Sequence, residues 1–130
     1  MVRIFFANLH PNCNVNRQNH AANGGAAWIT PPPPILYDPA AIVPHGNPWN
    51  NPAGRTGTAN IPVGGSVTMD YLVLSGPPNP TATITVQAFA GAPGQPARPT
   101  VQWTIAGGVV AHTHHITQAG NDFDIVINFH

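Results

Sequence analysis

Near the end of the chain, hydrophobic residues alternate with more polar ones, and this alternation constrains the fold more than any other feature. One side of the segment carries Phe123, Ile125, Ile127 and Phe129. Successive side chains of a β-strand point to opposite faces, so a period of two predicts a strand with one buried face. The same period recurs over residues 66–74 and 81–90. We therefore predict a protein built from half-buried strands, without substantial helix.

Glycine and proline separate the predicted strands. Clusters of turn-forming residues occur at 64–65, 76–80, 91–94, 107–108 and 119–121. Glycine supplies a positive φ and proline a fixed φ, which tight turns require. We predict that segments 100–106 and 109–117 form a hairpin around Gly107 and Gly108. We also predict that 109–117 pairs antiparallel with 122–130 through a short turn.

The region from residue 10 to residue 55 lacks this alternation. Asn, Pro, Gly and His are frequent there, and the prolines of the segment TPPPPILYDP cannot donate hydrogen bonds to a sheet. We predict a long irregular loop region with two short strands, near Ala26–Ile29 and Ile35–Tyr37. A first strand is expected before it, at Val2–Leu9. A connection of this length within a compact domain is often functional.

The predicted fold is one all-β domain over residues 1–130, an antiparallel β-sandwich of about seven strands. Residues 1–55 contribute the first strand and the Pro/Asn-rich loop region, and residues 56–130 contribute the regular strands. The layout of strands and turns from 56 to 129 resembles an immunoglobulin-type sandwich. This resemblance is one of pattern, and it implies a fold without implying a function.

The chain carries very few charges. Charged residues make up 6% of the sequence, against roughly 25% in a typical soluble domain, and the formal net charge is zero. A chain without a basic patch lacks the electrostatic attraction that binding to nucleic acids or membrane surfaces requires. Because neutral copies do not repel one another, we expect the protein to self-associate as a homo-oligomer.

We expect neither a signal peptide nor a transmembrane segment at the N-terminus. Its apolar core, Ile4–Ala7, is too short for either one. Cys13 is the only cysteine, which excludes an internal disulfide. Neither observation fixes the compartment in which the protein works.

No catalytic constellation is complete in the sequence. Ser66 and Ser75 are the only serines, and neither lies in a nucleophile-elbow motif. Cys13 has no neighbouring base other than His10. We therefore predict a non-enzymatic structural or binding module that self-associates through neutral surfaces and has no catalytic residue.

Three histidines cluster in the segment AHTHHI. On a strand, His112 and His114 point to the same face with β carbons about 7 Å apart, so their imidazoles could share a metal ion. Further ligands, or a partner that orients an imidazole, would come from His130, His45, Asp122 or Asp124. Imidazole ligands favour zinc or another transition metal. The other interpretation is that these histidines are half-exposed strand residues bonded to carbonyls or water.

Aromatic residues in the irregular region suggest an alternative function. Trp28, Tyr37 and Trp49 lie among asparagines, and planar side chains on loops beside amides are common in glycan-binding surfaces. A glycan-binding lectin is therefore the second hypothesis, and a small metal-dependent activity at the histidines is the third. The tryptophans would otherwise plug the open end of the sandwich. Trp103 alternates with Val101 and Ile105, which predicts a core position.

Overall fold

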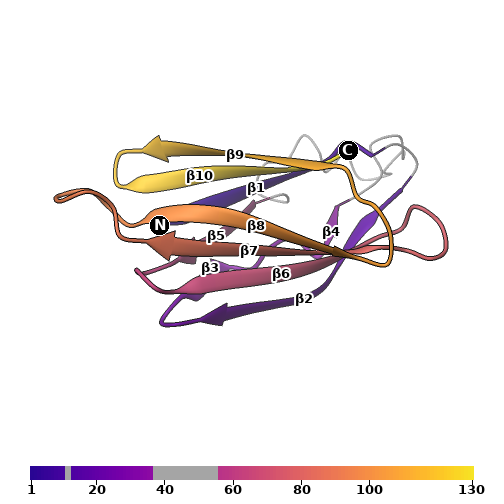
Figure 1. The fold of residues 1–130 in the computed structure, drawn as a ribbon, viewed down its shortest axis with the longest axis horizontal. Helices are drawn as coiled ribbons and strands as arrows, with labels where there is room; N and C mark the ends of the chain where they lie inside the picture. The colour runs from indigo at the N-terminus through magenta and orange to yellow at the C-terminus, as the bar shows by residue number, and fades with distance from the viewer. Residues whose placement is uncertain (11–12, 37–55) are drawn as a thin grey trace.

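The computed structural model describes residues 1–10, 13–36 and 56–130, which form ten β-strands and no helix. The strands make two sheets of five that lie face to face, as Figure 1 shows. The predicted all-β sandwich is confirmed, with more strands than expected. Within these described residues, no helix has the length and apolar character needed to cross a membrane.

The first sheet contains the only parallel pair of strands in the described residues. Strand β1 (Val2–Asn8) runs parallel to β10 (Asp122–Phe129), with Val2 opposite Phe123. The other pairs in this sheet are antiparallel. The strand order is β3 (Ala27–Thr30), β5 (Thr56–Asn60), β1, β10 and β9 (His112–Ala119). The prediction of an antiparallel sandwich therefore holds for this sheet except at the β1–β10 pair.

The second sheet is antiparallel throughout. Its strand order is β4 (Ile35–Leu36), β2 (Val15–Asn23), β6 (Ser66–Val73), β7 (Thr81–Phe89) and β8 (Arg98–Ala106). Strands β6 and β7 alternate strictly between buried and partly exposed side chains until the last residue of β7, as the period-two pattern predicts. Strand β8 ends this sheet in the same way that β9 ends the first one.

A common hydrophobic core joins the two sheets. The four alternating apolar side chains of β10 are all buried, each 4% exposed or less. Tyr71 of β6 packs against Phe6 of β1 and Phe129 of β10, with ring centroids 5.6 and 5.8 Å away. Its hydroxyl donates a 2.8 Å hydrogen bond to the carbonyl oxygen of Pro33. Burial raises the pKa of Tyr71, so this hydroxyl keeps its proton and remains a donor.

Strand β2 corrects the prediction that residues 10–55 contain only two short strands. Its sequence, VNRQNHAAN, has a single buried side chain, Val15, so hydrophobic alternation cannot mark it. Antiparallel pairing with β6 builds this strand into the sheet. The two predicted short strands correspond to β3 and β4. Residues 37–55, the remainder of the predicted loop region, lie outside the described residues.

The predicted hairpin around Gly107 and Gly108 is wrong, because β8 and β9 belong to different sheets. The φ of Gly108 is 155°, far from the values of about 90° or −80° that the second central residue of a type I′ or II′ hairpin turn requires. Val110 is buried in the core and anchors the segment that crosses between the sheets. The other predicted hairpin is confirmed, since β9 pairs antiparallel with β10 next to Gly120, whose φ is 65°.

Candidate functional site

The histidine segment lies on β9, and Trp103 of β8 contacts two of its histidines. These are the edge strands of the two sheets (Figure 1). Trp103 of β8 stacks on His112 of β9, with ring centroids 4.0 Å apart and ring planes 15° apart. Trp103 also meets Phe129 edge to face at 5.5 Å. The indole therefore fills the space between the two sheets where the sandwich would otherwise be open.

A hydrogen bond fixes the second histidine of this cluster. Trp103 Nε1 donates to His114 Nδ1 over 3.2 Å. An indole N–H can only donate, so the Nδ1 that accepts from it carries no proton. While this bond is formed, the free donor of a neutral His114 ring is Nε2. Trp103 thus holds one histidine by stacking and the other by a hydrogen bond.

The environment of His112 disfavours protonation of its imidazole. Partial burial lowers the pKa of His112, and the nearby positive charges of His114 and His130 lower it further. The stacked indole covers one face of its ring. A neutral imidazole is therefore the form of His112 that this environment favours.

His130, the proposed third metal ligand, takes part in a different set of contacts. Its Nε2 lies 2.8 Å from Thr113 Oγ1, which also accepts a 3.2 Å hydrogen bond from Asn128 Nδ2. Thr113 points to the opposite face of β9 from His112. In the described part of the chain, no three His, Cys, Asp or Glu side chains are close enough together to hold a metal ion. His45, the other proposed third ligand, lies outside the described residues.

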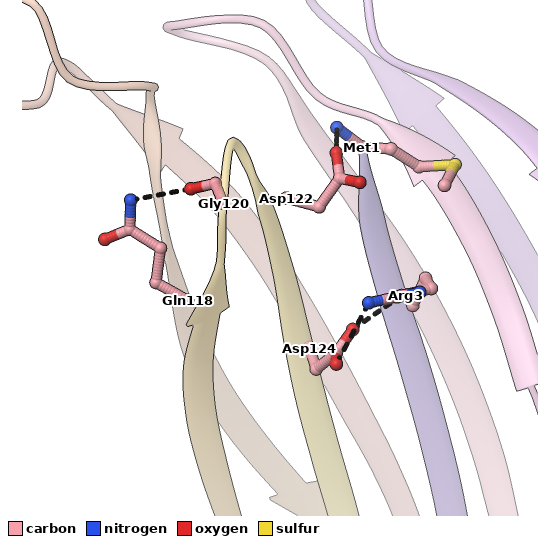
Figure 2. A network of polar contacts seen from close by, with 6 residues as sticks. All are labelled: Met1, Arg3, Gln118, Gly120, Asp122 and Asp124. Carbon is pink, nitrogen blue, oxygen red and sulfur yellow. Dashed lines mark hydrogen bonds and ion pairs between the residues drawn. The ribbon is translucent and has the colours of Figure 1, made fainter.

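The acidic residues expected beside the histidines form ion pairs elsewhere, as Figure 2 shows. Asp124 Oδ1 accepts a 2.6 Å hydrogen bond from Arg3 Nε, and Asp124 Oδ2 accepts one of 3.1 Å from Arg3 Nη2. Asp122 lies 3.1 Å from the amino group of Met1. These ion pairs link the N-terminal segment to β10. Both carboxylates therefore bind positively charged groups at a distance from the histidines.

Of the three aromatic residues proposed to bind a glycan, the structure describes only Trp28. Its Nε1 donates a 3.1 Å hydrogen bond to the carbonyl oxygen of Ala21, and its ring meets His20 edge to face at 6.2 Å. The ring also packs against the hydrophobic core. Tyr37 and Trp49 lie outside the described residues. Trp28 is therefore placed by packing at the edge of the first sheet.

Sequence reasoning missed the part that Trp103 plays. The alternation of Val101, Trp103 and Ile105 predicts the inward direction of the indole correctly, but all three side chains remain partly exposed. Trp103 lies on an edge strand, and in the part of the chain that the structure describes no further strand covers it. The sequence signal that could have found this contact lies on either side of Gly107 and Gly108. An aromatic residue alternates with apolar ones before the glycines, and two histidines occupy alternate positions after them.

Comparison of the chain with models of protein families, with curated proteins and with solved structures finds no match.

Proposed function

We propose that this protein is a non-enzymatic structural or binding module that self-associates through neutral surfaces. The observation that carries the proposal is how the few charged side chains are used. Most of those in the described residues contact a partner within the chain: Arg3, Arg17, Asp70, Asp122 and Asp124. Because the formal net charge is zero, copies of the chain approach one another without net electrostatic repulsion.

Apolar side chains on this neutral surface give association a driving force. Val109 is 92% exposed and Val63 is 60% exposed. Phe89, the last residue of β7, and Ile116, on the edge strand β9, are also exposed. Single exposed apolar residues are normal on protein surfaces. Burying these side chains between copies would nevertheless remove apolar area from water.

The experiment that tests the proposal is sedimentation velocity at neutral pH over roughly a hundred-fold range of protein concentration. We expect the weight-average sedimentation coefficient to rise with concentration, and to do so at high salt as well, because few charges are involved. A coefficient that stays at the monomer value throughout that range would contradict the proposal.

A further inference from the structure

One edge of β9 has no strand partner in the described part of the chain. The His130 N–H donates to the Ala111 carbonyl over 2.9 Å, and Phe129 lies opposite His112. In an antiparallel pair, hydrogen-bonded and non-hydrogen-bonded residue pairs alternate. The backbone groups of Thr113 and every second residue after it therefore bond to β10. Those that point to the free edge belong to His112, His114, Ile116 and Gln118.

The free edge of β9 also lacks the features with which proteins protect edge strands. Such features are short length, prolines, charged side chains and β-bulges. Strand β4 has two residues, β3 has a register shift and is followed by Pro31, and β8 begins with Arg98 and Pro99. Strand β9 has eight residues, HTHHITQA, with no proline, lysine, arginine or acidic residue, and its register with β10 is continuous.

We propose that β9 pairs antiparallel with β9 of a second copy of this chain, joining the two first sheets into one continuous sheet. This inference rests on the proposed self-association and names its interface. The eight outward backbone groups on each edge would then exchange hydrogen bonds, as in β-augmentation. The partner is a second copy because the same uncharged edge is available on every molecule, and a two-fold axis pairs it with itself.

Only one register of this pair uses all four outward-pointing residues on both strands. It places His112 opposite Gln118 of the second copy and His114 opposite Ile116 of the second copy. The two-fold axis then passes between the two His115 residues, which face each other in a non-hydrogen-bonded pair. On the outer face Thr113 lies opposite Thr117 of the second copy, and threonine pairs of this kind stabilise sheets.

Single cysteines test this register directly. In a non-hydrogen-bonded pair the Cα atoms are about 4.5 Å apart, within the range that a disulfide spans. His115→Cys should therefore give a disulfide-linked dimer as its main product under mild oxidation. Thr117→Cys is the matched control on the same exposed face, because its two cysteines would lie about 13 Å apart along the strands. The double variant Thr113→Cys, Thr117→Cys should cross-link again. Cys13 is buried and present in all three.

The outcomes separate this inference from the proposed function. Non-reducing electrophoresis should show dimer for His115→Cys and for the double variant, and little dimer for Thr117→Cys. Equal cross-linking of His115→Cys and Thr117→Cys, or none in either, would overturn the β9 pairing even if the unmodified protein associates in the centrifuge. If the unmodified protein stays monomeric there, the proposed self-association fails together with its interface.

Discussion

The imidazole of His112 lies flat against the indole of Trp103, although the two residues come from the edge strands of different sheets. The same indole donates a hydrogen bond to His114. Trp103 therefore connects the two sheets on the side where β8 and β9 are the edge strands. This contact holds β9 in place, and among residues 1–10, 13–36 and 56–130 no strand pairs with its outer edge. The edge from which association is proposed is therefore ordered before any partner arrives.

Removing the indole should destabilise the protein more than removing its N–H alone. Trp103→Ala loses the contacts with His112 and Phe129, and we expect a loss of about 2–4 kcal/mol of unfolding free energy, since the residue is partly exposed. Trp103→Phe keeps an aromatic ring at this position but loses the hydrogen bond to His114. The loss of that bond should lower the unfolding free energy by about 1 kcal/mol, in addition to the effect of the smaller ring. Urea denaturation measures both, and equal losses in the two variants would contradict this account.

The stability of the protein should fall on mild acidification. The pKa of His112 is lowered in the folded state, so the folded protein binds fewer protons than the unfolded chain. The contribution of His112 is therefore complete at neutral pH and decreases as the pH falls below about 6.5, the ordinary imidazole value, towards the lowered pKa. Urea midpoints measured from about pH 8 to pH 5 should show this slope. His112→Phe keeps a stacked ring and should flatten the slope; an unchanged slope would exclude His112 as its source.

The pair of Arg3 and Asp124 should contribute little to stability despite its two hydrogen bonds. Both side chains are about a third exposed, at 37% and 29%. Exposed ion pairs are typically worth between about 0 and 1 kcal/mol. A double-mutant cycle with Arg3→Ala and Asp124→Ala should give a coupling energy in that range, and salt should reduce it. A coupling well above that range would show that the pair is needed to hold β1 beside β10.

A proline on the free edge should prevent association without unfolding the strand. The N–H of Ile116 points away from β10, so Ile116→Pro removes no bond of the β9–β10 ladder, and edge strands tolerate proline at such positions. We expect the sedimentation coefficient to drop to the monomer value. Ile116→Thr is the control, because it removes apolar area and keeps the N–H. If Ile116→Thr is monomeric as well, the side chain and not the backbone edge drives association, and if Ile116→Pro still associates, the free edge of β9 is not the interface.

The strands that the sequence predicts well are those with one clearly apolar face. The alternation of Phe123 to Phe129 identifies β10 because every second side chain enters the core. Strand β2 escapes prediction because it is held by backbone pairing with β6 and buries only Val15. The sequence also does not predict that the chain passes from one sheet to the other between β8 and β9. A glycine pair is compatible with a hairpin and with a crossover, and the burial of Val110 distinguishes the two.

The histidine site is predictable only in part. The same-face placement of His112 and His114 follows from the strand period, whereas the partner of each ring depends on which strand lies across the sandwich. Trp103 takes that position because β8 and β9 end their respective sheets on the same side. Topology at this distance is not encoded in local alternation, so the sequence alone could not place an indole against these two histidines.

Amide hydrogen exchange resolved by residue tests the central claim most directly. In a monomer, the amides of Thr113, His115 and Thr117 are protected by β10, while those of His112, His114, Ile116 and Gln118 face solvent. We predict that raising the protein concentration will protect this second set and leave the first set unchanged, producing protection along the whole of β9. Fast exchange of the second set at concentrations where the protein is associated would contradict the pairing of β9 with a second copy.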